Sequence, residues 1–240
     1  MSSRHTKKIK PTLDNATNID VLIPAAGLGR RMKSYGPKAL IPIKYGQNIL
    51  ERQVNIIDQT LTKYSLVLVC GFEAEKLINN SPANAVKVEN ELYEDTNVAR
   101  SVGLGLRSIP NSDRVLFING DLVFTENAVN AIDYSRSSII VSEKQMSQGE
   151  VGCIVNSRGN LENMMYDLPM KWGQIAYFQD KELEILRSVA CNKKNRKLFM
   201  FEIINKVIEK GGIFKCVEDP SVNIVDVDTS KDIKKAKDII

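Results

Sequence analysis

Short apolar runs that alternate with segments of helical periodicity constrain the fold of this chain more than any other feature. Each run is apolar at consecutive positions, so both faces of the predicted strand are expected to be buried. Helices between such strands cover both faces of one sheet. The sequence therefore predicts an α/β fold of three layers, α/β/α, around a mostly parallel, mixed central sheet. In the first part of the chain the predicted strands are 20–25, 66–70, 85–88 and 115–118, and the predicted helices begin near residues 49, 73, 97 and 125.

The pattern becomes less regular in the second part of the chain. Polar turns, rather than helices, separate most of its strand-like runs. A helix that ends at a pair of glycines follows, and then a last strand and a last helix. These elements are the strands 138–142, 151–155, 175–178 and 223–227, the helix 198–210, and a helix from Ser230.

Most of the formal net charge of +4 lies at the N-terminus. Residues 1–18 contain four basic side chains and one acid, which leaves about +1 for the remaining residues. We expect this basic segment to be a disordered leader, because it lacks the apolar run of a signal peptide. The near-neutral remainder predicts no nucleic-acid partner. No apolar run is long enough to cross a bilayer, so we expect no membrane partner either.

Cysteine and histidine usage excludes several kinds of chemistry. The four cysteines lack the C-x-x-C spacing of zinc sites and the density of a disulfide framework, which predicts reduced thiols and a soluble, cytoplasmic protein. The only histidine is His5, in the basic leader. Imidazole is therefore not expected as a base or a metal ligand. Chemistry in this chain would depend on cations, carboxylates and a metal ion.

A glycine-containing loop follows the first predicted strand. Its residues are Ala25, Ala26, Gly27, Leu28, Gly29 and Arg30, and two further cations, Arg31 and Lys38, come soon after. Small side chains let backbone N–H groups approach an anion closely, and cations neutralise charge on phosphates. This pattern predicts a phosphate-binding loop.

Two familiar phosphate-binding motifs do not fit this loop. A dinucleotide-binding G-x-G-x-x-G would need glycine where Met32 stands. A Walker loop would need a hydroxyl residue after its lysine, whereas Ala39 follows Lys38.

Carboxylates occur in two places where a metal ion could bind. Asp121 comes directly after a predicted buried strand, and Asp226 and Asp228 lie two residues apart on a predicted strand, so they share one side of it. Such side chains are Mg²⁺ ligands in many enzymes. Two alternatives stay open: Asp121 could cap the next turn, and Asp228 could be solvated while Thr229 caps the last helix.

The glycine loop, together with Pro37-Lys38-Ala39-Leu40, resembles the signature of the nucleotidyltransferase (pyrophosphorylase) superfamily. The resemblance implies a Rossmann-like fold and an enzyme that joins a nucleoside triphosphate to a small phosphorylated metabolite, with Mg²⁺ as cofactor. It assigns Arg31 and Lys38 to catalysis on the phosphates, and Asp121 and Asp228 to the metal. The nucleotide contacts that it implies are Ala25, Ala26, Gly27, Leu28, Gly29, Arg30, Gly71, Asn90, Asn97, Ser101 and Gly120.

The segment 90–102 is similar to one in phosphocholine cytidylyltransferases, with N-x-x-Y followed by N-x-x-x-S. By this likeness Asn97 and Ser101 would lie near the base of the nucleotide, where an amide and a hydroxyl can distinguish base edges. The alternative is that Asn97 only caps a helix. The likeness favours CTP as the donor and a small phosphorylated alcohol or amine as the acceptor. A sugar 1-phosphate is the alternative acceptor.

The resemblance places the acceptor in the second part of the chain, near Lys171, Trp172 and Gly173. Lys171 could contact the acceptor's phosphate and Trp172 could wall its pocket, or Trp172 could be an ordinary core residue. The predicted organisation is a disordered leader 1–18 and one domain 19–240. That domain has a nucleotide-binding half of about 19–135, an acceptor-binding half of about 136–222, and a closing metal strand and helix 223–240.

Two other functions compete with this interpretation. Asp226-Val227-Asp228 imitates the D-x-D metal motif of glycosyltransferases, but it lies close to the end of the chain rather than in its middle. A nucleotide-binding module without activity would not need the cations and carboxylates named above. No appended domain is expected after the last helix, and the sequence predicts no particular oligomeric state.

Overall fold

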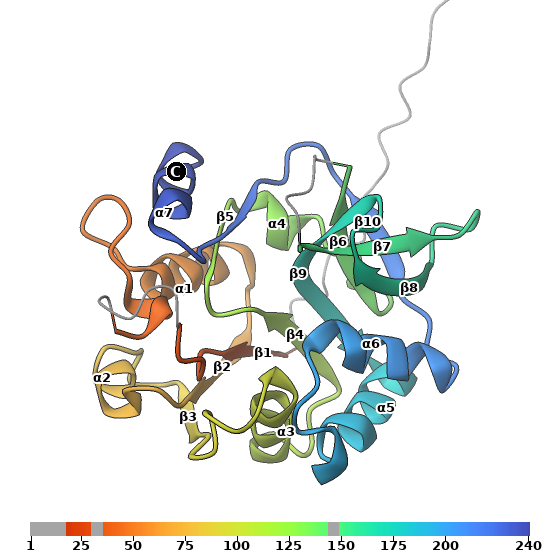
Figure 1. Ribbon diagram of the computed structural model, residues 1–240, viewed down its shortest axis with the longest axis horizontal. Coiled ribbons are helices and arrows are strands. Elements are labelled where there is room, and N and C mark those ends of the chain that lie inside the picture. Colours follow the sequence, from red (N-terminus) through yellow and green to blue (C-terminus); the bar gives the residue numbers. More distant parts are fainter. Residues whose placement is uncertain (1–17, 30–35, 144–148) are drawn as a thin grey trace, which may run out of the picture.

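A nine-stranded sheet forms the centre of the molecule in the computed structural model, which describes residues 18–29, 36–143 and 149–240 (Figure 1). The strand order is β10-β6-β9-β4-β1-β2-β3, and β7 and β8 form a hairpin that pairs with β9. In the seven-stranded series, β9 runs antiparallel to its neighbours and the other pairs are parallel. The strands are β1 Ile19–Pro24, β2 Tyr64–Cys70, β3 Val86–Glu89, β4 Arg114–Ile118, β6 Ser138–Ser142, β7 Val151–Val155, β8 Leu161–Tyr166, β9 Met170–Gln179 and β10 Lys215–Glu218.

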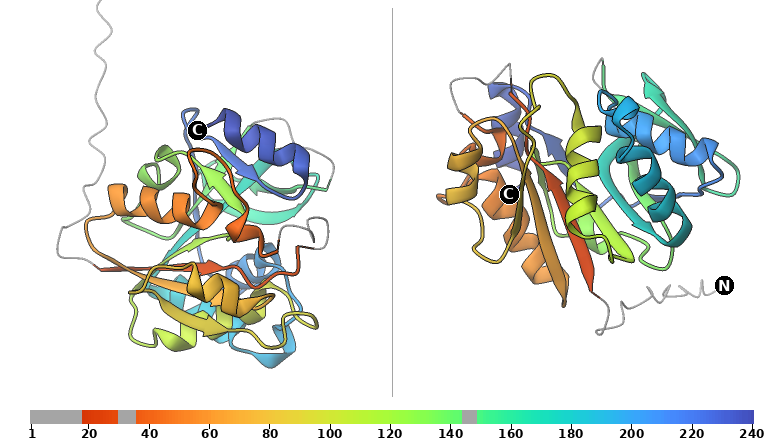
Figure 2. Two further views of the ribbon diagram at one scale, coloured as in Figure 1. Left: turned by 90° about the vertical axis from the view of Figure 1, so that its left-hand side faces the viewer. Right: turned by 90° about the horizontal axis from the view of Figure 1, so that it is seen from below.

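Helices cover both faces of this sheet, which confirms the predicted three layers (Figure 2). In β1, Val21 and Ile23 contact the layer of α1, α2 and α4, whereas Leu22 faces the layer of α3, α5 and α6. This alternation follows from the two-residue period of a strand, and it explains why the run is apolar throughout. The helices are α1 Ile49–Thr60, α2 Ala74–Asn79, α3 Val98–Ser108, α4 Asn127–Asn130, α5 Asp180–Ala190, α6 Met200–Glu209 and α7 Ser230–Asp238.

A small antiparallel ribbon links the end of the chain to its middle. Strand β5, Leu122–Phe124, pairs with β11, Ile224–Asp226, and the N–H of Val227 donates to the carbonyl of Asp121 at 3.0 Å. Helix α7 then packs against a separate apolar cluster that includes Ile41, Ile49 and Val123. The ribbon therefore fixes the last strand beside the residues that follow β4.

Several elements differ from the sequence-based expectation. Strand β8, helix α5 and the short strands β5 and β10 were not predicted, and β9 is longer than the predicted 175–178. In β8 the buried positions are Leu161 and Met164, and a spacing of three hides the two-residue period of a strand. Strand β10 is only partly buried, so it lacks an apolar run.

The predicted leader lies outside the described residues except for its last residue. The amide of Asn18 donates to the hydroxyl of Ser65 at 3.2 Å, next to the start of β1. Among the helices of the described ranges, none combines the length and the apolarity needed to cross a membrane.

Candidate functional site

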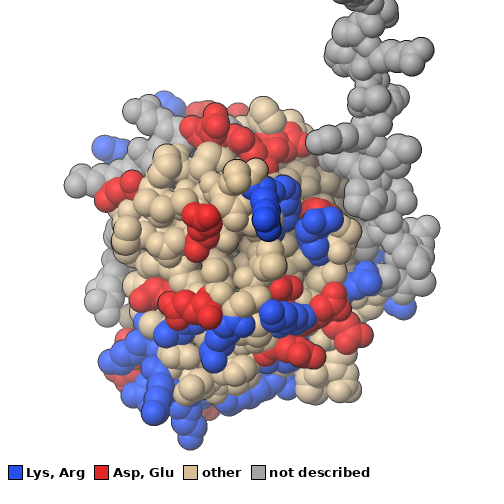
Figure 3. All heavy atoms as spheres, turned by 90° about the vertical axis from the view of Figure 1, so that its right-hand side faces the viewer, with Lys and Arg blue, Asp and Glu red and all other residues tan. Residues whose placement is uncertain are grey.

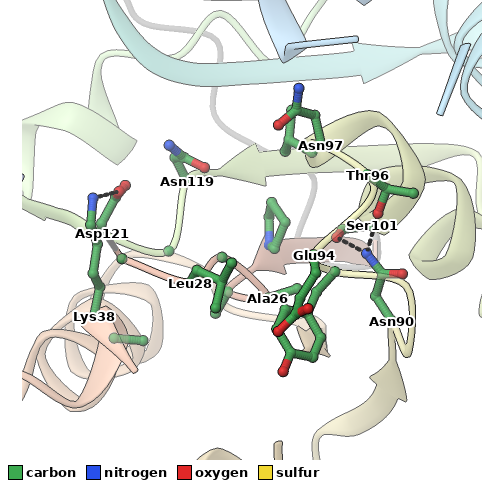
Figure 4. Close-up of a pocket in the computed structure, with 18 of the residues that line it drawn as sticks. Ala26, Leu28, Lys38, Asn90, Glu94, Thr96, Asn97, Ser101, Asn119 and Asp121 are labelled. Atoms are coloured by element: carbon green, nitrogen blue, oxygen red, sulfur yellow. Dashed lines mark hydrogen bonds and ion pairs between the residues drawn. The ribbon is translucent and has the colours of Figure 1, made fainter. Parts of the chain in front are cut away.

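Lys38 connects two carboxylates that are far from it in the sequence. It begins the 3₁₀ turn η2, Lys38–Leu40, and its Nζ donates to Asp121 Oδ2 at 2.8 Å and to Asp228 Oδ1 at 2.5 Å. Figure 4 shows the contact with Asp121. Burial opposes the charge of Lys38, but the two carboxylates outweigh this effect and raise its pKa above the ordinary value. Lys38 therefore stays protonated. Of the residues that the sequence assigned to phosphate and metal, Lys38, Asp121 and Asp228 therefore meet.

Asp121 is held in place by a turn after β4. The N–H of Gly120 donates to the carbonyl of Pro24 at 3.2 Å, and a Cβ at Gly120 would lie only 2.7 Å from that oxygen. Only glycine permits this approach. The buried amide of Gln53 in α1 donates to the carbonyls of Asn119 and Leu122. These contacts fix the turn, and with it the carboxylate.

Asp226 joins the two predicted acids. One carboxylate oxygen each from Asp121, Asp226 and Asp228 lie within 4.8 Å of one another. Burial and then the negative charges of Asp121 and Asp228 raise the pKa of Asp226 to about 7, although a hydrogen bond from Gln174 opposes this. A second cation near these three acids would relieve their mutual repulsion.

This cluster fits a divalent cation. Asp121 Oδ1 and Asp226 Oδ1 are buried, and neither has a hydrogen-bond partner within the described part of the chain. Buried carboxylate oxygens without partners are costly. Clustered carboxylate oxygens are the ligands that Mg²⁺ and Mn²⁺ prefer. The donor set therefore suits the metal that the sequence predicts.

Gln174 is a site residue that sequence reasoning missed. Its Nε2 donates to Asp226 Oδ2 at 2.7 Å, and its Oε1 accepts from Asn119 Nδ2 at 2.8 Å. Its φ of 57° lies in the left-handed region, and the pairing of β6 with β9 shifts register beside it. Such local strain and bulges re-aim side chains at functional sites. No motif in the sequence signals this.

The first cavity has a volume of about 570 Å³ and lies beside the glycine loop (Figure 4). Gly27, Leu28 and Gly29 line it, and no acceptor for their N–H groups is found within the described residues. No atom of the described residues lies within 4 Å of where a Cβ would be at Gly27. As far as the described residues go, the loop therefore has N–H groups without acceptors and open space at Gly27, both of which suit a ligand. The cavity is lined by Pro24, Ala25, Ala26, Gly27, Leu28, Gly29, Lys38, Ala39, Asn90, Tyr93, Glu94, Thr96, Asn97, Val98, Ser101, Asn119, Gly120, Asp121 and Asp228.

The other end of this cavity is polar. The amide of Asn90, which is 2 % exposed, donates to Thr96 Oγ1 and to Ser101 Oγ, each at 3.2 Å. Asn90 Oδ1 is buried without a hydrogen-bond partner among the described residues. Asn97 is the N-cap residue of α3, but its side chain does not cap the helix and instead donates to the carbonyl of Lys197. Asn97 thus occupies the N-cap position without a capping hydrogen bond from its side chain, and its predicted contact with a base stays a prediction.

Gly71, Arg30 and Arg31 are predicted nucleotide or phosphate contacts that the structure does not place in the cavity. Gly71 is not among the residues that line the cavity; a Cβ there would lie 2.6 Å from the carbonyl oxygen of Ala26, so Gly71 lets β2 support the loop from behind. Arg30 and Arg31 lie outside the described residues. Their predicted contact with phosphates therefore stays a prediction.

A second cavity, of about 480 Å³, meets the first at Asp228. Asn119 and Val98 also line both cavities. Aromatic rings and acids line the second cavity together: Phe117, Tyr166, Trp172, Phe199 and Phe201, with Glu150, Asp226, Asp228 and Asp232. The two cavities thus share Asp228, which is one of the two carboxylates that Lys38 contacts.

The predicted acceptor residues divide between this cavity and the core. Lys171 lines the cavity and forms an ion pair with Glu150. Trp172 also lines it, although it is only 5 % exposed and packs in the core, and its indole N–H has no partner among the described residues. Gly173 lines neither cavity: a Cβ there would lie 2.9 Å from Ile140 and from Ile224. Its predicted role in acceptor binding is not supported by this position.

Comparison with known proteins identifies the family. The sequence model of the MobA-like NTP transferase domain matches residues 21–199. The chain belongs to this family. It is a nucleotidyltransferase, as the glycine loop and the P-K motif predicted. In this nucleotidyltransferase the match includes the residues that line both cavities up to Phe199. The lining residues after the match are Met200, Phe201, Asp226, Asp228, Thr229, Asp232 and Lys235.

Relatives of the nucleotidyltransferase include a longer curated protein. Bifunctional protein GlmU of Methanococcus aeolicus is 28% identical over 206 residues, which cover 81% of this chain and 48% of the relative. The chain thus spans about half the length of that protein.

Three solved structures share the fold of the nucleotidyltransferase. CTP:phosphocholine cytidylyltransferase from Streptococcus pneumoniae superposes with a TM-score of 0.76 at 18% identity, over 92% of this chain and 98% of that one. Inositol-1-phosphate CTP transferase from T. maritima gives 0.74 at 16% identity, over 92% and 95%. A nucleoside-diphosphate-sugar pyrophosphorylase from Vibrio cholerae gives 0.66 at 13% identity, over 91% and 99%. At these identities the likeness establishes the fold.

Proposed function

We propose that this nucleotidyltransferase transfers a cytidylyl group from CTP to a small phosphorylated alcohol or amine, with Mg²⁺ as cofactor and pyrophosphate as the second product. The observation that carries the proposal is the meeting of two cavities at Asp228, beside Lys38 and the other two acids. A donor in one cavity and an acceptor in the other would bring their reacting groups to the same cluster of charges. Holding two reactants in this way removes much of the entropic cost of the reaction.

The first cavity supports the donor site. Its glycine loop offers N–H groups to phosphate oxygens, and Lys38 lies at the same end. Its other end carries Asn90 and Ser101, whose amide and hydroxyl can hydrogen-bond the edge of a base. The cavity thus has cationic and N–H groups at one end and polar side chains at the other, which suits the phosphates and the base of a nucleoside triphosphate.

The second cavity supports a cationic or polyol acceptor. Tyr166 and Phe201 pack edge to face with centroids 5.2 Å apart, and Phe199 stacks on Phe201 at 6.1 Å. Phe199 and Tyr166 are 48% and 44% exposed, so their rings are open to a ligand. Aromatic rings with carboxylates nearby attract a positively charged amine. Lys171 and Lys235 both line this cavity, paired with Glu150 and Asp232. We assign the acceptor's phosphate to Lys171, which would exchange Glu150 for it.

The reaction that fits this arrangement needs no general base. An acceptor phosphate is largely ionised at neutral pH, because its second pKa is about 6. One of its oxygens forms a bond to the α-phosphorus of the triphosphate, and the bond from that phosphorus to the bridging oxygen breaks, so pyrophosphate leaves with the electron pair. Lys38 neutralises charge on the departing group. The absence of a usable histidine in this chain is compatible with such chemistry.

Asp121, Asp226 and Asp228 would hold the Mg²⁺ ion. When bound, the ion would neutralise negative charge where the acceptor phosphate meets the triphosphate. Lys38 and the ion would both offset the charge of the three acids. We therefore expect Lys38 to turn from Asp228 toward phosphate oxygens when nucleotide and metal bind.

A sugar 1-phosphate is the second candidate acceptor. The nucleoside-diphosphate-sugar pyrophosphorylase from Vibrio cholerae shares the fold over most of the chain. The carboxylates beside the aromatic rings of the second cavity favour a positively charged amine instead. A glycosyltransferase is disfavoured by the match to the NTP transferase family. The cytoplasmic location of the protein, expected from its cysteine usage, stays a prediction.

The proposal is tested by a pyrophosphate-release screen of the full chain. CTP, UTP, GTP and dTTP are each combined with phosphocholine, phosphoethanolamine, inositol 1-phosphate, glycerol 3-phosphate and a panel of sugar 1-phosphates, with Mg²⁺ or with EDTA. We expect Mg²⁺-dependent release with CTP and one of the alcohol or amine phosphates. Lys38→Ala and Asp121→Ala should lose it by at least 100-fold while they remain folded. Release with a sugar 1-phosphate alone would select the second candidate, and near-wild-type release in either variant would refute the site.

A further inference from the structure

A third cavity, of about 220 Å³, lies between α3, the end of α5 and the 3₁₀ turn η3, Lys193–Asn195. We call it the α3 basic cavity. It belongs to neither the first nor the second cavity, since it shares no lining residue with them. Its lining residues are Leu92, Arg100, Gly103, Arg107, Ala190, Cys191, Asn192, Lys193 and Arg196.

Four of these residues are cations and none is an acid. Within the described ranges, no carboxylate forms a salt bridge with Arg100, Arg107, Lys193 or Arg196. Figure 3 shows Lys and Arg side chains gathered along the lower edge of the molecule, the level of the lower ends of α3 and α5 in Figure 1. Like charges held close together repel one another, so an anion placed among them would be stabilising.

Arg100 gives independent evidence of a missing partner. Its Nε is buried and has no hydrogen-bond partner among the described residues, although its neighbour Arg107 donates to the carbonyl of Cys191 at 2.9 Å. A buried donor without an acceptor costs free energy. Guanidinium groups bind phosphate-like oxyanions through two parallel hydrogen bonds, so Arg100 could turn its guanidinium group toward such a ligand and gain both the missing acceptor and charge neutralisation.

The α3 basic cavity results from the close packing of α3 against the end of α5. A Cβ at Gly103 would lie 2.4 Å from the carbonyl oxygen of Ala190, so glycine allows α3 to contact the end of α5. Arg100, Gly103 and Arg107 share one face of α3 because they are three and four residues apart. The close contact of the two helices brings the arginines of α3 next to Lys193 and Arg196.

We propose that the α3 basic cavity is a binding site for a small, multiply charged oxyanion of the phosphate class. Its volume is below the range of about 300–1,000 Å³ typical of sites for drug-sized ligands, which favours a phosphate group or a pyrophosphate over a larger molecule. A nucleic acid is disfavoured, because a polyanionic strand needs an extended groove rather than a small concavity.

The cavity is connected to both catalytic cavities through the backbone that follows η3. The N–H of Asn97 donates to the carbonyl of Arg196 at 3.0 Å, and the N–H of Ala99 donates to the carbonyl of Leu198 at 3.2 Å. Asn97 lines the first cavity, and Phe199 lines the second. An anion that fixes Arg196 should therefore change the affinity for nucleotide, and nucleotide should change the affinity for the anion by the same factor.

The test is an NMR titration of the ¹⁵N-labelled full chain with inorganic phosphate, and in a second arm with pyrophosphate, at constant ionic strength. Backbone amides report location, so binding at Gly103 and Cys191 is distinguished from binding at the glycine loop. We expect saturable shifts at Gly103, Cys191 and Asn192. The double variant Lys193→Glu/Arg196→Glu should weaken this binding at least tenfold. The control Lys63→Glu/Lys234→Glu, which makes the same change of charge on exposed lysines outside the three cavities, should leave it unchanged.

Three results would overturn the site: no saturable shift at these amides, equal weakening in the two double variants, or displacement of phosphate by a single-stranded oligonucleotide that binds more tightly. The link to the catalytic cavities is judged separately, by the dissociation constant of CTP with and without phosphate in the wild type and in Lys193→Glu/Arg196→Glu. A phosphate effect that is equal in both would contradict that link while the anion site itself stands. Because the NMR readout does not require turnover, failure of the proposed function would leave this test valid.

Discussion

Lys38 and Asp228 are separated by 190 positions in the chain, yet Lys38 Nζ lies 2.5 Å from Asp228 Oδ1. Two structural features create this contact: the 3₁₀ turn after Pro37, and the β5–β11 ribbon that returns the end of the chain to the middle of the molecule. The lysine thus links Asp121 to Asp228.

Replacing Lys38 by methionine should make the fold depend on divalent ions. Without the ammonium group, Asp121, Asp226 and Asp228 repel one another within 4.8 Å. Breaking a buried ion pair costs about 3–5 kcal/mol, and we expect about 2 kcal/mol here because the Asp228 side chain is 39% exposed. Urea unfolding in EDTA should show this loss, and Mg²⁺ should restore most of it. Lys63→Met, on an exposed lysine, is the control. Equal stability of Lys38→Met with EDTA and with Mg²⁺ would argue against the cluster as a metal site.

Chelation of divalent ions should also expose a pH dependence of stability that arises from Asp226. Burial and the neighbouring carboxylates raise the pKa of Asp226 from 3.8 to about 7 in the folded chain. The folded chain therefore holds this proton more tightly than the unfolded chain. The stabilisation is complete below the unfolded pKa and is lost as pH rises through about 7, with a slope of up to about 1.4 kcal/mol per pH unit. Urea unfolding at pH 5 and at pH 7.5 in EDTA measures it. Asp226→Asn should lack this fall, and an identical fall in that variant would show that another group causes it.

Two glycine substitutions should separate ligand binding from folding. Gly27→Ala places a methyl group where no described residue lies within 4 Å, at a φ outside the left-handed region, so the melting temperature should not change. The methyl group would occupy the space where phosphates approach, and CTP affinity should fall at least tenfold. Gly120→Ala instead puts a Cβ 2.7 Å from the carbonyl oxygen of Pro24 and should cost about 2 kcal/mol of stability. Calorimetric titration and urea unfolding of both variants test this. Unchanged nucleotide binding by Gly27→Ala would mean that the loop does not carry the triphosphate.

Removal of an aromatic ring from the second cavity should weaken binding of the acceptor and leave binding of CTP unchanged. Phe199 lines that cavity and not the first, and it is 48% exposed, so Phe199→Ala should leave the fold intact. We expect the acceptor KM to rise at least fivefold and the CTP KM to stay within twofold. Ile213→Ala, at an exposed apolar residue outside all three cavities, controls for general surface effects. A rise in the CTP KM instead would reverse the assignment of the two cavities.

Much of the fold and of the charged cluster could be predicted from the sequence because the signals are local. Strands buried on both faces leave continuous apolar runs, as at β1 and β2. The glycine loop and Lys38 form one compact motif. Gly120 marks the end of β4 just before Asp121, and the start of α7 marks the end of β11 just after Asp228. Thr229 occupies the N-cap position of α7, where its N–H and hydroxyl donate to Asp232, while Asp228 contacts Lys38.

Features that depend on tertiary context were not predictable in the same way. Gln174 reaches Asp226 only because its backbone adopts a φ of 57° at a register shift between two strands. Helix α5 has apolar residues at helical spacing, but it follows β9 without a loop. The chain changes direction at Asp180, whose φ is 47°, so no glycine or proline marks the boundary in the sequence. The α3 basic cavity is likewise assembled from three segments that no single motif connects.

The most direct test of the central claim is a crystal structure of the full chain with Mn²⁺ and a non-hydrolysable CTP analogue. We predict a metal ion in contact with Asp121 and Asp228, a triphosphate over residues 25–29, and Lys38 on phosphate oxygens rather than on Asp228. A metal ion bound elsewhere, or a nucleotide that leaves the glycine loop empty, would contradict the account.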